Sequence, residues 1–207
     1  MICLIKKDLL LTKKYLLFMI IIVIALPIVL AIQSSEASAF TSTMAFTFEV
    51  IYAEFLICRY LAMKEYQYPK AASFLSTLPY TRSMQIVSKY LLYLIIFAFC
   101  CIAYWIDTLF VSDLASIDLN LIIPILFMTS ILYSIYMPVQ YMFGYEKSKL
   151  IFMFLLIAFP LLISRTNAAN ILVILSKMSY PIMLIAVIGA LLLSSMTTIN
   201  ILIRKEL

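Results

Sequence analysis

Residues 63–90 read MKEYQYPKAASFLSTLPYTRSMQIVSKY and form the one long polar break between strongly hydrophobic segments of the chain. A single acidic residue, Glu65, accompanies four basic ones: Lys64, Lys70, Arg82 and Lys89. Short loops that are rich in Lys and Arg stay on the cytoplasmic side of a membrane. The composition of this break therefore predicts that it faces the cytoplasm, with membrane-spanning segments on both sides of it.

Within the break, residues 68–78 have the pattern of an amphipathic helix. Four apolar residues recur at i, i+3, i+4 and i+7 and so share one helical face: Ala71, Phe74, Leu75 and Leu78. Because Pro79 disfavours helical backbone in the residue before it, this helix is expected to end there, and a new helix is expected near Ser83. An apolar face at this place requires a partner, which is either another protein or the membrane surface.

The composition of the whole chain is that of a membrane protein. Of its 207 residues, 66% are hydrophobic and 12% are charged, and the mean hydropathy is +1.12. A soluble domain is about 45–50% apolar and about 25% charged. We therefore expect an all-α, polytopic integral membrane protein with a single transmembrane domain over residues 1–207.

Six apolar segments are predicted to cross the bilayer, for which a helix needs ~20 residues. These predicted spans are residues 15–32, 40–62, 86–109, 119–143, 150–167 and 181–203. The fifth has only about 14 clearly apolar residues, so it either continues through residues 168–171 or partly re-enters the membrane. Pro124 and Pro138 fall inside the fourth span, where they predict a kink or a broken helix. A short external helix is predicted at residues 168–176, before the last span.

The N-terminal residues and the distribution of charge predict the orientation of the chain. Residues 1–14 mix apolar positions with lysines, which favours a helix that lies in the membrane interface with its lysines at the headgroups. A simple basic flank is the alternative. All but three of the 15 Lys and Arg residues fall in segments predicted to face the cytoplasm. Both termini are therefore expected in the cytoplasm, and the basic residues are expected to meet anionic lipid, not nucleic acid.

The second predicted span contains three ionisable residues, Glu49, Glu54 and Arg59. Such a residue at membrane depth costs about 2.5 kcal/mol or more unless it faces protein, water or an opposite charge. One interpretation is structural: the carboxylates pair with Arg59 or with polar groups of a neighbouring helix. The other is functional: they line a polar translocation path or bind basic groups of a transported molecule. Both interpretations stay open at this point.

Several function classes are excluded by residues that the chain lacks. Its two glycines, Gly144 and Gly189, cannot form a Gly-rich phosphate loop, so the chain is not expected to bind or hydrolyse ATP itself. Histidine is absent and the cysteines show no metal-ligand spacing, so neither a metal site nor a catalytic site is predicted. The cysteines are expected to act as small apolar residues: Cys3, Cys58, Cys100 and Cys101.

The end of the third span is expected to lie at the outer face of the membrane. Tyr104 and Trp105 are placed there as interfacial aromatic residues. Three carboxylates that follow without a basic residue predict a solvated external loop with no calcium-binding spacing: Asp107, Asp113 and Asp118.

The polar break also resembles a loop of bacterial ABC-2 type transporter permeases. LSTLPYTR at residues 75–82, with QIV at 85–87 and SKYL at 88–91, is similar to that family's SLP-[IVL]-[ST]-R element and the I-V-x-[GS]-K-Y that follows it. Thr77 and Tyr80 depart from the family's usual Ser and small aliphatic residue. KKDLLL at residues 6–11 is similar to the family's N-terminal KDL element, and the six-span hydropathy pattern extends the resemblance along the chain.

The resemblance implies that the chain is the permease subunit of an ATP-binding cassette exporter. The chain resembles small permeases that export amphipathic cytolytic peptides in staphylococci. A second permease copy or a sister permease is then expected, together with a separate ATPase subunit that holds ATP and Mg, while this chain holds no cofactor. The expected cargo is hydrophobic or amphipathic: a peptide, a toxin or a drug. A non-transport membrane protein, such as a scaffold or an immunity factor, is the alternative.

In such an exporter, residues 63–85 are the cytoplasmic coupling loop, and the apolar face of its helix docks on the ATPase subunit. A helix that rests on the membrane is the alternative. The residues expected to carry the coupling are Phe74, Leu75, Leu78, Pro79, Arg82 and Lys89. Pro79 fixes the turn, and Arg82 and Lys89 lie where the next helix leaves the interface.

Overall fold

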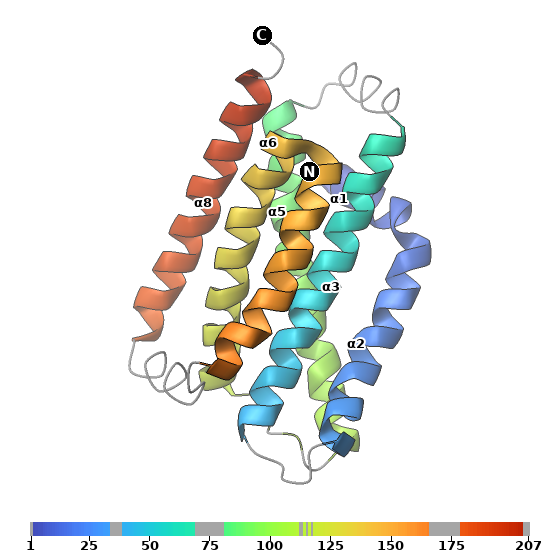
Figure 1. Ribbon diagram of the computed structural model, residues 1–207, viewed down its shortest axis with the longest axis vertical. Helices are drawn as coiled ribbons and strands as arrows, with labels where there is room; N and C mark the ends of the chain where they lie inside the picture. Colours follow the sequence, from blue (N-terminus) through green and yellow to red (C-terminus); the bar gives the residue numbers. More distant parts are fainter. Residues whose placement is uncertain are drawn as a thin grey trace. The chain divides into compact units, whose positions relative to one another are not determined.

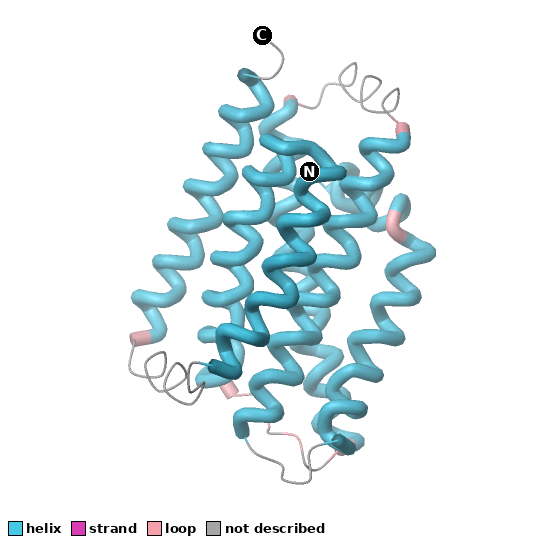
Figure 2. Tube along the Cα trace, viewed as in Figure 1, coloured by secondary structure: helices cyan, strands magenta, loops and turns pink. Residues whose placement is uncertain are grey.

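The computed structural model of the chain describes residues 2–33, 39–68, 81–111, 114, 116, 118–165 and 179–204. All regular secondary structure in this part of the chain is helical, which confirms the all-α class (Figure 2). The helices are α1 (Ile2–Leu11), α2 (Lys13–Gln33), α3 (Ala39–Gln67), α5 (Arg82–Phe110), α6 (Leu119–Arg165) and α8 (Tyr180–Arg204) (Figure 1). They belong to two compact units, Met1–Ile117 and Asp118–Leu207.

The first unit is a three-helix bundle of α2, α3 and α5 with the short helix α1 packed against it. Successive helices α2, α3 and α5 run in alternating directions (Figure 1). The chain bends by 79° between Cys3–Leu11 and Tyr15–Val29. Thr12 lies at this bend, and its hydroxyl donates to the carbonyl oxygens of Asp8 at 3.0 Å and Leu9 at 3.1 Å. A hydroxyl that bonds back to the preceding turn satisfies carbonyl groups at the end of a helix.

The core of the first unit follows one face of α5. Its buried residues recur alternately three and four positions apart, as the helical period requires: Ile86, Lys89, Tyr93, Ile96, Cys100, Ala103 and Asp107. Aromatic rings of α3 and α5 pack within this core. The ring of Phe46 lies 4.8 Å from that of Tyr104 and 6.3 Å from that of Phe97, measured between centroids. Such distances are typical of favourable aromatic pairs.

The second unit consists of α6 packed against α8. Ile123 of α6 and Met183 of α8 form its buried apolar centre. Ser194 of α8 donates a hydrogen bond of 2.7 Å to the backbone carbonyl of Ser134 in α6. Polar residues of this kind link helices that pack inside a membrane.

Helix α6 contains the fourth predicted span and most of the fifth, and its backbone leaves the helical conformation at Gly144 (φ 77, ψ 176). Because this φ lies in the left-handed region, glycine is the residue that occupies it without strain. The described helix α6 continues through Pro124 and Pro138, so it is not broken at either proline, and a kink there stays a prediction. The backbone leaves the helical conformation after the fourth predicted span, at Gly144.

The helices agree with the predicted spans in different degrees. Helices α2, α3, α5 and α8 each contain one predicted span. Three helical stretches of the described chain are long and apolar enough to cross a membrane: Ser83–Phe110, Leu119–Ser148 and Tyr180–Arg204. If the bent pair of α1 and α2 is counted as one span, the described chain has up to four such stretches. Helix α3, which carries Glu49, Glu54 and Arg59, is not among them. Six spans therefore stay a prediction.

Two predicted helices lie outside the described residues. These are the amphipathic helix at residues 68–78, of which the structure describes only Tyr68, and the external helix at residues 168–176. The helix expected to begin near Ser83 is confirmed, since α5 begins at Arg82.

Candidate functional site

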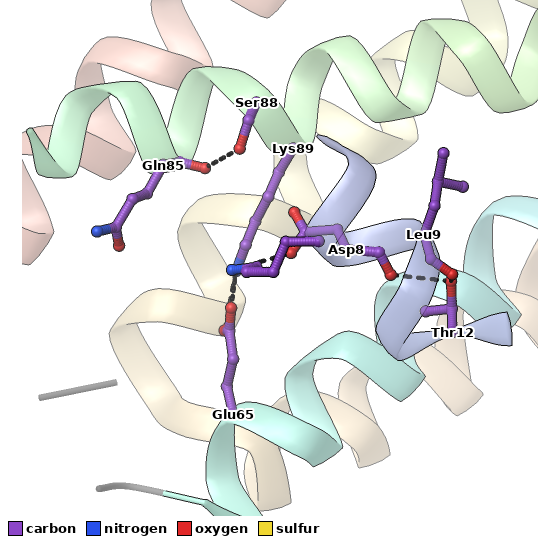
Figure 3. Close-up of polar contacts among 8 residues, drawn as sticks. Asp8, Leu9, Thr12, Glu65, Gln85, Ser88 and Lys89 are labelled. Atoms are coloured by element: carbon purple, nitrogen blue, oxygen red, sulfur yellow. Dashed lines mark hydrogen bonds and ion pairs between the residues drawn. The ribbon is translucent and has the colours of Figure 1, made fainter. Parts of the chain in front are cut away.

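An ion pair ties α3 to α5 next to the polar break. The ammonium nitrogen of Lys89 lies 2.7 Å from Oε1 and 2.8 Å from Oε2 of Glu65, so it contacts both carboxylate oxygens (Figure 3). The side chain of Lys89 is only 9% exposed, whereas that of Glu65 is 43% exposed. A buried ammonium group is tolerated inside a protein only when it is paired. Glu65 therefore neutralises Lys89 from the half-exposed end of α3.

Helix α1 brings a second carboxylate to the same place. Asp8 is 2% exposed, and its Oδ1 lies 3.1 Å from the ammonium nitrogen of Lys7. Figure 3 shows Asp8 beside Lys89 and Glu65, so that α1, α3 and α5 meet in one charged cluster. Burial raises the pKa of Asp8 above its ordinary value, and the nearby charges of Lys7 and Lys89 oppose this rise. We call Lys7, Asp8, Glu65 and Lys89 the basal charge cluster.

Lys89 was expected at a docking surface, where a side chain is exposed, but in the basal charge cluster it is buried and paired. Its side chain is buried within the first unit, two turns after α5 begins. Glu65 lies in the last turn of α3, so the ion pair fastens together the two helices that enter and leave the polar break. Of the other predicted coupling residues, Arg82 opens α5, and four lie outside the described residues: Phe74, Leu75, Leu78 and Pro79.

A second group of ionisable side chains lies farther along α3 and α5. Glu49 of α3 is 0% exposed and Asp107 of α5 is 1% exposed. Neither carboxylate oxygen of Glu49 and neither of Asp107 has a hydrogen-bond partner among the described residues. The Asp107 carboxyl is close enough to that of Glu49 for the two to interact electrostatically. Glu54 is also buried, and its Oε1 likewise has no hydrogen-bond partner in the described part of the chain.

Aromatic and sulfur-containing side chains surround these carboxyls. Tyr104 interacts electrostatically with both Glu49 and Asp107, while its hydroxyl donates a hydrogen bond of 3.4 Å to the backbone carbonyl of Ser42. The thiol of Cys100 interacts electrostatically with Glu49 and Glu54. Among the described residues no group of three or more His, Cys, Asp and Glu side chains could hold a metal ion.

Arg59 does not neutralise the carboxyl of Glu49. Its guanidinium carbon lies 5.6 Å from the centre of the Phe55 ring, an arrangement typical of a cation–π contact. The structural interpretation of Glu49 as the partner of Arg59 is therefore not the arrangement that the structure contains. The assignment of Glu49, Glu54 and Arg59 to a translocation path stays a prediction.

The structure corrects two expectations for the end of the third span. Asp107 was expected in a solvated loop but lies within α5, which continues to Phe110, and it faces the core. Tyr104 was expected at the interface but is completely buried, whereas the neighbouring Trp105 is exposed. The period of α5 could have indicated both, since Asp107 and Tyr104 fall seven and four positions after the apolar Cys100.

Comparison with known proteins agrees with the helical architecture and with the resemblance of the polar break. No curated protein and no solved structure matches the chain. A family model described as ABC-2 family transporter protein matches residues 3–204. This range includes every described helix from α2 to α8 and nearly all of α1. The chain therefore belongs to the ABC-2 transporter family.

Proposed function

We propose that this chain is the membrane permease subunit of an ATP-binding cassette exporter. The observation that carries the proposal is the match to the ABC-2 family model over residues 3–204. The proposed cargo is hydrophobic or amphipathic, such as a peptide, a toxin or a drug, and it moves out of the cell. ATP and Mg belong to a separate ATPase subunit, and a second permease copy or a sister permease completes the transporter.

The arrangement of α3 and α5 supports a mechanical link to that ATPase. Residues 69–80 connect these two helices, and the ion pair between Glu65 and Lys89 fastens the helices at the base of the connection. A movement of the connecting segment would then be transmitted to α3 and α5 together. Helix α1 shares the basal charge cluster through Asp8, so the same movement would reach the N-terminal helix.

The proposal is tested by the proteins that copurify with this chain and by the source of ATP hydrolysis. The chain purified alone in mild detergent is expected to show no ATP hydrolysis, because its two glycines provide no phosphate-binding loop. A copurified ATPase is expected to hydrolyse ATP and, in proteoliposomes, to drive the movement of an amphipathic peptide. ATP hydrolysis that remains after every copurifying ATPase is removed, or the consistent absence of such a partner, would contradict the proposal.

The orientation in the membrane gives a second expected result. A cysteine in place of Ser116 should react with a membrane-impermeant maleimide in intact cells, whereas cysteines in place of Gln67 or Lys147 should react only after permeabilisation. All three side chains are exposed, so the difference reports the side of the membrane and not burial. Cys3 is also exposed and is replaced by Ser in the background chain. Labelling at Lys147 in intact cells would show the opposite orientation.

A further inference from the structure

The two ends of the buried face of α5 differ in how their charged groups are satisfied. At one end, Lys89 contacts both carboxylate oxygens of Glu65. At the other end, Asp107 lies near a second acidic residue, Glu49 of α3, and no cation among the described residues pairs with either carboxyl. Lys89 and Asp107 are 18 residues apart in α5, which corresponds to about 27 Å along the helix axis and is close to the thickness of the hydrocarbon core of a membrane. The acidic pair thus lies at the opposite end of the bundle from the basal charge cluster.

The acidic pair combines complete burial with hydrogen-bond acceptors that the described residues leave unsatisfied. Four carboxylate oxygens from two facing helices are buried, and none of them has a hydrogen-bond partner in the described part of the chain. Buried carboxylates in folded proteins are normally paired or hydrogen-bonded.

The surroundings of the pair indicate the chemical class of the ligand. Ionised carboxylates only accept hydrogen bonds, so their partner must be a donor or a cation. Tyr104 lies near both carboxyls, and its ring packs 4.8 Å from that of Phe46. Aromatic rings next to carboxylates are a typical environment for an organic cation, since the ring face attracts positive charge. The described side chains offer no set of metal ligands here.

We propose that Glu49 and Asp107 together bind an ammonium or guanidinium group of the transported molecule, so that the exporter recognises cationic amphipathic cargo. The inference rests on the proposed export function. Both carboxyls are buried in the described arrangement, so the cargo binds when α3 and α5 separate. Neutralising both carboxyls removes the preference for positive charge and leaves the affinity for the apolar part of the cargo.

Binding to the chain without its ATPase tests the inference directly. The probe is a fluorescent amphipathic peptide with lysines on its polar face, compared with the same peptide in which every lysine is glutamine. The chain is placed in nanodiscs of zwitterionic lipid, and empty discs give the background. Wild-type protein is expected to bind the lysine peptide about tenfold or more tightly than the glutamine peptide. The double variant Glu49→Gln, Asp107→Asn is expected to bind both peptides equally.

A matched control uses Asp118, an exposed carboxylate at the start of α6. Asp118→Asn changes the net charge as either single substitution does, and it should keep the full preference for lysine. Equal binding of the two peptides by wild-type protein would overturn the inference, and this comparison requires no variant to fold. An unchanged preference in the double variant would overturn it as well. So would a changed number of chain copies per disc, because the pair would then contact a second copy.

Transport with the ATPase present separates this inference from the proposed function. ATP-driven movement of both peptides at the same rate would refute the preference for cations and leave the export function intact. If no ATPase partner is found and neither peptide moves, the export function fails. A preference for lysine in the binding experiment would then contradict the role of the pair in export, since the site would have no transport to serve.

Discussion

Lys89→Met is expected to destabilise the chain by about 2–3 kcal/mol, although it changes no part of the apolar core. The substitution keeps the length of the side chain but removes the positive charge that Glu65 and Asp8 surround. Asp8 is 2% exposed, so its carboxylate would stay buried without the charge of Lys89, and among the described residues the half-buried Lys7 would remain as its partner. The heating temperature at which half of the protein remains monodisperse in detergent should fall by roughly 5–10 °C.

Two further variants show which charge is responsible. Glu65→Gln should lower stability by less than Lys89→Met does, because the amide oxygen of Gln at this half-exposed position can still accept a hydrogen bond from Lys89 and the charge of Asp8 stays nearby. Asp8→Asn should restore part of the stability in the Lys89→Met background, since it removes the buried negative charge. If Lys89→Met is as stable as wild type, the basal charge cluster does not hold the three helices together. If Glu65→Gln is as damaging as Lys89→Met, the loss comes from the pair of Glu65 and Lys89 and not from the buried charge of Asp8.

The pH dependence of the Lys89→Met variant provides an independent measurement. The pKa of Asp8 is raised by burial, so its charged form disfavours the folded state above that pKa. Without Lys89 this unfavourable contribution grows at neutral pH, and it disappears as the pH falls toward the ordinary carboxyl pKa of about 4. The stability difference between wild type and Lys89→Met should therefore shrink as the pH is lowered from 8 to about 5. A difference that stays constant over this range would exclude Asp8 as its cause.

Hydropathy predicted the helical elements well because membrane helices must be both apolar and long. Apolar length alone identifies the core of α2, α5 and α8. Apolar length was less informative about the positions at which a helix bends or ends, because these depend on the backbone conformation of single residues. Two prolines in α6 indicated a kink or a break. The helix is not broken at either of them, since proline is accommodated when neighbouring helices or hydroxyl groups satisfy the freed carbonyl, and the non-helical residue is Gly144.

The charged residues were recognised in the sequence, but their partners were not. Glu49 was identified because it interrupts an apolar run, and this signal needs only local sequence. Its neighbour Asp107 is 58 positions away and was assigned to a loop, because a carboxylate near the end of a span resembles the start of a solvated turn. Only the packing of α3 against α5 brings them together, and the same holds for Lys89 and Glu65, which are 24 positions apart.

The double variant Leu75→Asp, Leu78→Asp is expected to abolish export and ATPase stimulation while the subunit still inserts into the membrane. The two residues lie outside the described part of the chain, and the expectation rests on their sequence pattern and on the helices that flank them. Leu75 and Leu78 share the apolar face of residues 68–78, and a docked apolar anchor typically costs about 2 kcal/mol or more when it is removed. Two carboxylates in such a face would prevent docking on the ATPase.

The flanking ion pair makes this effect larger than the loss of a surface contact. Glu65 and Lys89 fasten the ends of α3 and α5, so the connecting segment has a firm base on which an ATPase subunit can push. Ser76→Asp is the matched control, because residue 76 lies on the opposite side of the predicted helix and the substitution adds the same charge as either single leucine substitution. It should keep the ATPase bound and export active. Stimulation and export that persist in the Leu75→Asp, Leu78→Asp variant, at normal levels of inserted protein, would show that coupling to the ATPase takes place elsewhere.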